Sequence, residues 1–433
     1  MKRVAIVGAG AAGICMGRYL RSNSKITNFV IYEQAKKIGG TWIYDDNIPN
    51  PKYGSSGFKE LKTSSEIHSS MYRNLRTNLP KQLMEYPDFP FAEDKKSFVR
   101  HYDILEYINN YADEFAVKDH IKFNNKVSNI TPVGDGDKIK WKVTAVDDNS
   151  VSEDAYDSVV ICNGHFAKAD IPDIQGIENF KGSLLHSHLY RVPDRYKDKR
   201  VLVLGGSASA RDIAVEISQV ADSVVLSHRN EAGQCDLPRN VSEQPAMRRI
   251  DTNGNVVLAD GNICKVDAIV FCTGYLYDMP FLDAKCGIEI KENRICHLYK
   301  QIFNVRYPSM AFVGVPSIVC PFQLFSMQAR WISNVFDGQA VLPSTEVMLK
   351  DSEHEFEDKV KQGIPPKYFH RLDKGTNLEY FDVISNSGEV EPLKTVLGKM
   401  FLKVKHERET NLLTYREKEY VVVSDEDFEV TGG

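Results

Sequence analysis

The chain has 433 residues, which predicts two or three domains at about 100–200 residues per domain. Hydrophobic residues make up 42% and charged residues 26%, a composition that excludes a disordered or fibrous chain. The 54 basic and 59 acidic side chains give a formal charge of −5, so no global field attracts nucleic acid or an anionic membrane. Any phosphate binding must therefore depend on local structure.

The sequence predicts neither a membrane span nor a metal centre or disulfide framework. No apolar run approaches the roughly 18 residues of a membrane helix, and strand-like sequence begins at Arg3 with no signal peptide ahead of it. The eight cysteines include no C-x-x-C pair and no zinc spacing. We therefore expect a soluble cytoplasmic protein without a metal, or a secreted one if a signal peptide has been removed.

The first predicted unit is a strand, a glycine turn and a helix. Arg3–Val7 is a β-branched run that ends at the turn GAGAAG, and the sequence after the turn has helical apolar spacing. Gly8 permits a tight turn, Gly10 lets a diphosphate approach the backbone, and Gly13 lets the helix pack on the strand. The N-terminus of this helix supplies unpaired N–H donors and a positive dipole.

A second predicted strand ends at an acidic position. Asn28–Tyr32 is apolar and leads directly to Glu33, 20 residues after Gly13. In a dinucleotide-binding unit the carboxylate at this place accepts hydrogen bonds from ribose hydroxyls. The strand, the turn, the helix and the acid together predict a site suited to FAD.

The same pattern recurs in an imperfect copy. Lys199–Leu204 is a buried strand followed by the turn GGSASA, and a helix is predicted over Arg211–Ser218. Gly205 keeps the first glycine of the turn, whereas Ser207 and Ala210 replace the second and third. The turn can still form, but its floor is bulkier.

The acidic position differs between the two copies. After the strand Ser223–Ser227 the chain has His228 and Arg229, where the first copy has Glu33. An arginine there accommodates a 2′-phosphate, which an acid would repel. The second site is therefore predicted to bind NADPH rather than NADH.

Two more apolar strands, Asp157–Cys162 and Asp267–Phe271, end in glycine turns on either side of the second copy. We therefore predict an α/β fold with two Rossmann-like dinucleotide-binding domains, the NADPH domain being inserted into the FAD domain. The predicted limits are 1–167 and 301–433 for the FAD domain, and 168–300 for the NADPH domain. Charged and aromatic residues alternate beyond residue 344, and we expect this C-terminal extension to end in a solvated, frayed tail at 424–433.

Several further segments resemble those of the flavin-containing monooxygenases. They are EQAKKIGGTW at 33–42, HSSMYRNLRTNLPKQLMEYPDFPF at 68–91 and FKGSLLHSHLY at 180–190, which matches the identifying pattern FxGxxxHxxxY of the family. DAIVFCTGY at 267–275 is similar to the DxxxFATGY sequence of N-oxygenating members, with Cys272 in place of alanine. The chain resembles in particular the soluble insect enzymes, some of which N-oxygenate pyrrolizidine alkaloids such as senecionine.

The resemblance implies an NADPH- and O2-dependent monooxygenase with FAD as its flavin. It implies that oxygen passes through a flavin hydroperoxide to a nucleophilic nitrogen or sulfur, which gives N-oxides or S-oxides. Tertiary-amine alkaloids would be suitable substrates, and their detoxification a suitable role. Members of the family form dimers or tetramers, so a homo-oligomer is expected.

The resemblance also implies individual site residues. The residues implied for FAD are Gly8, Gly10, Ala12, Gly13, Glu33, Thr41, Trp42 and Gln323, and Gln328, which matches a recurrent glutamine of the family, is also implied as a cofactor residue. Those implied for NADP are Tyr72, Gly205, Ser207, Ser209, Ala210, Arg211, Asp212 and Arg229. Thr77, Asn78 and Leu79 are implied where flavin, nicotinamide and oxygen meet. The Asn78 amide can donate and accept hydrogen bonds without titrating, which suits a catalytic residue, although an asparagine before Leu-Pro can also bond its own backbone.

Other protein classes share parts of this pattern. A Baeyer–Villiger monooxygenase uses the same two domains, but its signature usually ends in Trp followed by Pro or Asp, where this chain has Tyr190 and Arg191. A flavin disulfide reductase needs a dithiol, which the sequence lacks. A non-enzymatic redox sensor that binds FAD and NADP(H) is the alternative from a different class.

Overall fold

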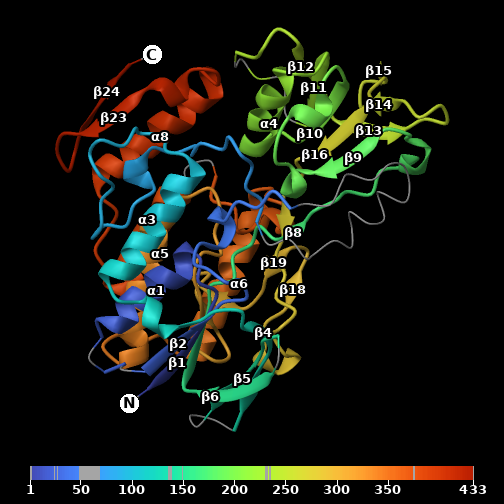
Figure 1. Cartoon of the computed structure of the whole chain (residues 1–433). Helices are drawn as coiled ribbons and strands as arrows, with labels where there is room; N and C mark the ends of the chain where they lie inside the picture. Colours follow the sequence, from blue (N-terminus) through green and yellow to red (C-terminus); the bar gives the residue numbers. More distant parts are fainter. Residues whose placement is uncertain are drawn as a thin grey trace.

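The computed structural model describes residues 2–23, 25–26, 28–47, 69–134, 139–148, 150–229, 233, 236–373 and 376–432. Two largely parallel sheets form the centres of two units, and one glycine turn lies in each unit (Figure 1). The predicted α/β fold with two Rossmann-like units is therefore confirmed. Within these residues, no helix combines the length and the apolarity that crossing a membrane requires.

The larger sheet has the strand order β20-β21-β22-β7-β1-β2-β3 and is parallel from β22 to β3. Its strands are β1 (Arg3–Val7), β2 (Asn28–Tyr32), β3 (Ile121–Lys122), β7 (Ser158–Ile161), β20 (Leu298–Tyr299), β21 (Phe303–Asn304) and β22 (Met310–Phe312). Val4 and Ile6 belong to the core on one face, and Ala5 and Val7 to the core on the other. Because both faces are buried, β1 is apolar at each of its four buried positions, Val4–Val7, and only Arg3 at its start is charged.

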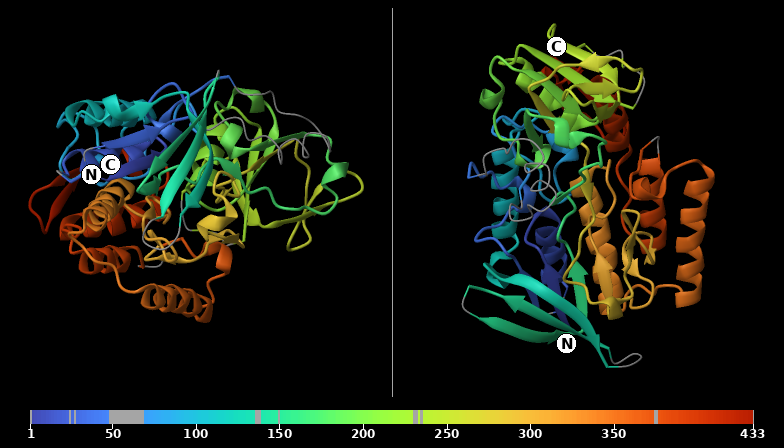
Figure 2. Two further views of the ribbon diagram at one scale, coloured as in Figure 1. Left: turned by 90° about the horizontal axis from the view of Figure 1, so that it is seen from below. Right: turned by 90° about the vertical axis from the view of Figure 1, so that its right-hand side faces the viewer.

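Different layers cover the two faces of this sheet. Three helices lie over one face, α1 (Ala11–Arg21), α3 (His101–Glu114) and α5 (Pro321–Asp337). An antiparallel sheet lies under the other face, formed by β4 (Lys126–Val133), β5 (Lys140–Val146) and β6 (Val151–Tyr156) (Figure 2). Trp141 and Tyr156 of this second layer are fully buried against the large sheet.

The second unit is built on a sheet with the order β12-β11-β10-β16-β9, parallel throughout. Its strands are β9 (Ser183–His186), β10 (Arg200–Leu204), β11 (Ser223–His228), β12 (Val241–Pro245) and β16 (Ala268–Phe271). Helix α4 (Ala208–Ser218) packs on β10 and β11, and begins three residues before the predicted helix. Shorter sheets accompany the two units, namely β13 (Met247–Ile250) with β14 (Val256–Leu258) and β15 (Ile263–Cys264), and β18 (Ile290–Lys291) with β19 (Arg294–Ile295).

The chain enters and leaves the second unit side by side. Strand β8 (Lys168–Ala169) pairs antiparallel with β17 (Tyr275–Leu276). Before the predicted limit at residue 300, β20 already pairs in the larger sheet, and Met279 and Cys286 belong to the core on one face of that sheet. We propose that the second unit ends near β17; the other domain limits stay predictions.

The C-terminal part consists of α6 (Thr345–Lys361), α7 (Thr376–Gly388), α8 (Thr395–Thr410) and the hairpin of β23 (Glu419–Val422) and β24 (Phe428–Thr431). The expected fraying is therefore wrong for Phe428–Thr431, whereas most residues of 424–432 are exposed to solvent as expected. Tyr420 is fully buried, and its ring contacts Phe98 and Phe428. The many charged residues near the C-terminus predicted a solvated tail, but the aromatic side chains of Tyr420 and Phe428 pack together and fix the hairpin to the protein.

Candidate active site

The first glycine turn has no room for side chains at two of its glycines. Gly8 has φ +102°, and its N–H donates to the carbonyl oxygen of Tyr32 at 2.8 Å. A Cβ on Gly8 would lie 2.6 Å from the carbonyl oxygen of Cys162, and a Cβ on Gly13 would lie 1.8 Å from that of Gly8. Both glycines are thus required by the protein fold itself.

Gly10 differs from these two glycines. Its φ is −77°, and a Cβ there would meet nothing closer than the Cα of Gly40 at 3.5 Å. Gly10 precedes α1, whose N-terminus has no side-chain cap and no acidic residue in its first turn. The fold does not require a glycine at this position, so the open space beside the unpaired N–H groups suits an approaching diphosphate.

Glu33 supports the turn from the end of β2. Its carboxylate is 4% exposed and accepts hydrogen bonds from the backbone N–H groups of Ala9 and Ala35, both at 2.7 Å. Each oxygen retains a lone pair for a ribose hydroxyl. Thr41 and Trp42 lie in the 3-10 helix Gly40–Trp42, which the contact of Gly40 with Gly10 places beside the turn.

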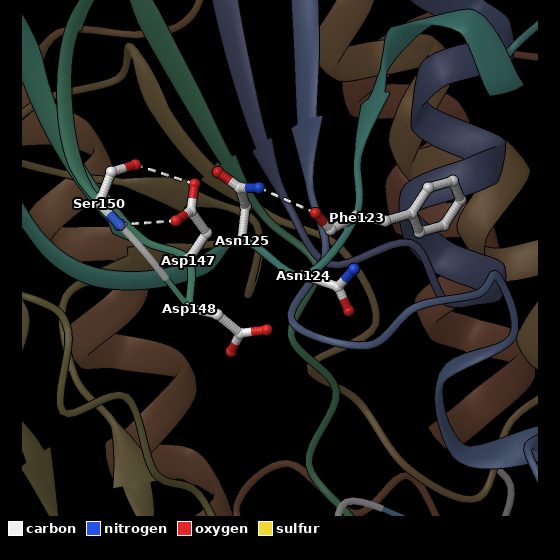
Figure 3. Close-up of a pocket in the computed structure, with 6 residues that line it drawn as sticks. All are labelled: Phe123, Asn124, Asn125, Asp147, Asp148 and Ser150. Carbon is white, nitrogen blue, oxygen red and sulfur yellow. Dashed lines mark hydrogen bonds between the residues drawn. The ribbon is translucent and has the colours of Figure 1, made fainter.

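A surface hollow of about 310 Å³ lies near this end of β2 (Figure 3). It is lined by Phe123, Asn124, Asn125, Asp147, Asp148 and Ser150. The Asn125 N–H donates to the Glu33 carbonyl, and the Asp147 carboxylate accepts from the backbone and hydroxyl of Ser150. Turn residues thus form the hollow, and no predicted cofactor residue lines it.

The second turn repeats the backbone contacts of the first. Gly205 has φ +144°, its N–H donates to the Ser227 carbonyl at 2.9 Å, and a Cβ would lie 2.3 Å from the Cys272 carbonyl oxygen. Ser207 occupies the position before α4 that Gly10 holds before α1, and its side chain is exposed. Ala210 is buried, and Ser209 is exposed in the first turn of the helix.

Arg229 directly follows β11, at the place where the sequence predicts a phosphate-binding arginine. It is exposed, and its Nη2 donates to the Tyr368 hydroxyl at 2.6 Å. The Lys367 Nζ lies 5.0 Å from the Tyr368 ring centroid. A neutral phenol does not cancel the charge of Arg229, so this guanidinium remains available to a phosphate.

The two charged residues in the N-terminal half of α4 already contact other parts of the protein. Arg211 Nη2 lies 3.8 Å from Glu243 Oε1. Asp212 binds both terminal nitrogens of Arg416, at 3.0 and 2.6 Å, and accepts from the Tyr72 hydroxyl at 3.1 Å. Asp212 therefore connects α4 to other elements, and a direct contact of its carboxylate with the nucleotide stays a prediction.

Thr77 and Asn78 present polar side chains without hydrogen-bond partners among the described residues. Thr77 is 3% exposed, and its buried Oγ1 has no hydrogen-bond partner among the described residues. The half-buried Asn78 amide likewise bonds to none of them, so the alternative of a bond to its own backbone is not observed. Leu79 is buried beside them. An unpartnered hydroxyl and amide side by side suit a bound ligand.

The two predicted glutamines of α5 have different surroundings. Gln323 is buried, and its Nε2 donates to the Glu85 carbonyl at 2.9 Å. Gln328 is completely buried, accepts from the Gly314 N–H at 2.9 Å and donates to the Tyr380 hydroxyl at 3.4 Å. Because both amide atoms of Gln328 are bonded to protein, we now propose that it holds Gly314 rather than a flavin.

The segment at 180–190 has a structural role at the join of the two units. A Cβ on Gly182 would lie 2.3 Å from the Asp267 carbonyl oxygen. Burial lowers the pKa of His186 to about 3, so its neutral ring accepts from the His188 N–H. The buried Tyr190 ring contacts Tyr72 at 5.6 Å. Among the residues that the structure describes, no group of three or more His, Cys, Asp or Glu side chains could hold a metal.

Three residues of the site region were not predicted from the sequence. Arg191 is 2% exposed and donates to four backbone carbonyls, including those of Ser69 and Asp45 at 2.9 and 2.7 Å. Its position directly after the FxGxxxHxxxY segment could have drawn attention to it. Tyr368 and Arg416 reach the second unit from the C-terminal part, and no spacing in the sequence connects them with it.

Comparison with known proteins identifies a family and close structural relatives. Residues 1–240 and 231–406 match the family described as Flavin-binding monooxygenase-like. The chain is 36% identical over 385 residues to Flavin-containing monooxygenase FMO GS-OX-like 4 of Arabidopsis thaliana, covering 85% of this chain and 83% of that protein. S-allyl-L-cysteine S-oxygenase from Allium sativum is similar in structure, with a TM-score of 0.88, 32% identity and coverage of 96% and 95%. Tmm from Pelagibacter sp. strain HTCC7211 gives a TM-score of 0.81, 27% identity and coverage of 99% and 96%.

Substitution Gly10→Ala tests whether the space beside α1 serves a cofactor. The added methyl group makes only ordinary contacts in the protein, so the urea midpoint of the cofactor-free protein should change little. FAD affinity, measured by fluorescence titration, should fall by at least about tenfold because the diphosphate must approach this backbone. Gly398→Ala in α8, which also meets only ordinary contacts, is the matched control. Unchanged FAD affinity in the Gly10 variant would contradict the assignment.

Substitution Arg229→Ala tests the predicted phosphate contact. Loss of a charge-assisted hydrogen bond should weaken binding of NADP+ by roughly tenfold to a hundredfold, while NAD+ binding changes little. Tyr368→Phe, which keeps the guanidinium, should have the smaller effect. Titration calorimetry with both nucleotides measures the difference, and equal losses for NADP+ and NAD+ would remove Arg229 from the phosphate site.

Proposed function

The chain belongs to the flavin-binding monooxygenase-like family, and from this we propose that it oxygenates a soft nucleophilic sulfur or nitrogen atom of a small substrate. It is a flavoprotein monooxygenase, and the enzymes of this family use FAD and NADPH. Substrate class and the roles of individual residues are the parts that we propose.

The residues present fit both cofactors. On the FAD side there are the open space at Gly10, the uncapped N-terminus of α1 and the Glu33 carboxylate. On the NADPH side there are the uncapped N-terminus of α4 and the charge of Arg229. When bound, NADPH supplies a hydride and the reduced flavin supplies the chemistry that activates O2.

The chain itself has to orient the substrate and exclude water. We propose that Asn78 and Thr77 do the first, because their side chains have no partner among the described residues. Asn78 offers a donor and an acceptor that do not titrate, so no general acid–base pair is needed. Leu79, next to Asn78, and Tyr72 are both buried, and we propose that these two side chains limit access of water.

Two observations bear on the atom that is oxygenated. A structural relative with 32% identity is named as an S-oxygenase, which supports a sulfide substrate. The segment DAIVFCTGY, similar to that of N-oxygenating enzymes, supports a tertiary amine as the second candidate, and an alkaloid amine remains part of this proposal.

A substrate panel tests the proposed reaction. Holoenzyme, NADPH and ¹⁸O2 are mixed with an allyl sulfide, a tertiary amine or a cyclic ketone, and the products are analysed by mass spectrometry. We expect one labelled oxygen in a sulfoxide or N-oxide, with product and NADPH oxidation in close to equal amounts. A labelled ester from the ketone alone would indicate Baeyer–Villiger chemistry, and no NADPH oxidation with any compound would favour a sensor.

Substitution Asn78→Ser tests the proposed role of the amide. Loss of an aligned donor should lower the rate of product formation by about a hundredfold while the protein keeps its FAD. Asn109→Ser on α3, where the amide bonds only the Leu105 carbonyl, is the matched control. Product formation at the wild-type rate in the Asn78 variant would show that the amide has no catalytic role.

A further inference from the structure

We infer that Arg416 is a positioning residue, which holds the nucleotide helix α4 at a set distance from the segment that carries Thr77 and Asn78. The inference rests on the proposed function of these two elements as the NADPH and flavin sides of one site. Arg416 touches neither Asn78 nor the predicted phosphate residue Arg229 through any described bond, so it acts through the elements that it joins.

The Arg416 guanidinium connects three parts of the chain that are distant in sequence. It lies in the 3-10 helix Tyr415–Glu417, between α8 and β23. Its Nη1 and Nη2 donate to the two carboxylate oxygens of Asp212 in α4, and its Nε donates to the Thr77 carbonyl at 3.0 Å. The Arg416 and Asp212 side chains are only 17% and 15% exposed, so solvent screens this pair weakly.

The acidic face of α4 meets the Tyr72–Thr77 segment at two successive turns. Asp212 accepts from the Tyr72 hydroxyl, and Glu216, four residues later, accepts from the Asn74 amide at 2.7 Å. Burial raises the pKa of Tyr72 well above its usual value, so its hydroxyl stays protonated and donates. Arg416 supplies the positive charge that Asp212 needs at this buried contact.

The 3-10 helix is fixed on the flavin side by contacts other than the ion pair. Arg76 donates to the Arg416 carbonyl and to the Glu417 carboxylate, both at 2.6 Å. The Tyr415 ring is fully buried and contacts Phe98 at 5.3 Å. Loss of the Arg416 side chain should therefore leave this helix in place and release α4, which separates a positioning role from a general loss of structure.

The geometry gives Arg416 a direct effect on the distance between the two cofactor sides. Asn78 directly follows Thr77, whose carbonyl Arg416 holds, and the α4 N-terminus lies about one turn before Asp212. An arginine fits this place because its planar guanidinium can bind a carboxylate with two nitrogens and a carbonyl with the third. A lysine has no equivalent geometry.

Hydrogen exchange of the FAD-loaded protein without NADP+ tests the inference independently of catalysis. Arg416→Gln should increase exchange in peptides covering 208–218 and 72–79, while peptides of β23 and β24 remain protected. Arg200→Gln is the matched control, because Arg200 binds Asp267 with two nitrogens inside the second unit. Wild-type exchange in both peptides, or a loss of protection confined to 411–422, would overturn the inference.

NADP+ titration of the same variants gives a second readout. Arg416→Gln and Asp212→Asn should each weaken NADP+ binding by about tenfold, because each leaves one buried charge without its partner. The double variant has no such charge, so its loss of affinity should be much smaller than the product of the two single losses. Arg416→Lys should recover only part of the affinity. If Arg416→Gln does not fold, Asp212→Asn carries the test. Affinity within about twofold of wild type in the single variants would contradict the inference, whereas failure of the substrate panel alone would overturn only the proposed function.

Discussion

Two backbone contacts that leave no space for a Cβ atom organise both nucleotide-binding units. The carbonyl oxygen of Cys162 faces Gly8 at the end of β1, and the carbonyl oxygen of Cys272 faces Gly205 at the end of β10. In each unit the N–H of this glycine donates to a carbonyl near the end of the neighbouring parallel strand, that of Tyr32 for Gly8 and that of Ser227 for Gly205. A strand therefore contacts the turn on each side. Helices α1 and α4 begin directly after these turns, whose backbone conformation depends on the two glycines.

The two units then differ in what surrounds the common turn. The first has an open glycine position and a carboxylate at the end of its second strand, whereas the second has a serine and an arginine at the equivalent places. These differences support our proposal that the first unit binds FAD and the second binds NADPH, without any net positive charge on the protein. The segment from Tyr72 to Asn78 lies between them, and Arg416 joins it to the second helix.

Most of the sheet framework could be predicted because buried parallel strands are short apolar runs that end in glycine turns. The predicted strands at Arg3–Val7 and Asn28–Tyr32 agree with the structure to the residue. Helix α4 begins at Ala208, earlier than predicted. Ala208 and Ser209 can adopt either a turn or a helical conformation after Ser207, so the sequence did not show where the helix begins. Short apolar runs and glycine turns determine where these elements form, so the same features predict the elements from the sequence.

The remaining features depend on contacts between distant parts of the chain. The pairing of Arg416 with Asp212 spans 204 positions, and the burial of Tyr420 depends on Phe98, so neither leaves a periodic signal. For Gln328, a motif match shows the residue type and not what its amide faces, and its contacts with Gly314 and Tyr380 lead us to propose a structural role. Family resemblance supplied the segment with Thr77 and Asn78, and the structure added that their side-chain polar atoms have no hydrogen-bond partner among the described residues.

A crystal structure of the protein with FAD and NADP+ bound would test the central claim most directly. We predict that the FAD diphosphate lies against the N-terminus of α1 and the NADP+ diphosphate against the N-terminus of α4, with both ring systems reaching Asn78. A structure with either diphosphate away from its helix, or with both nucleotides in one unit, would contradict the account.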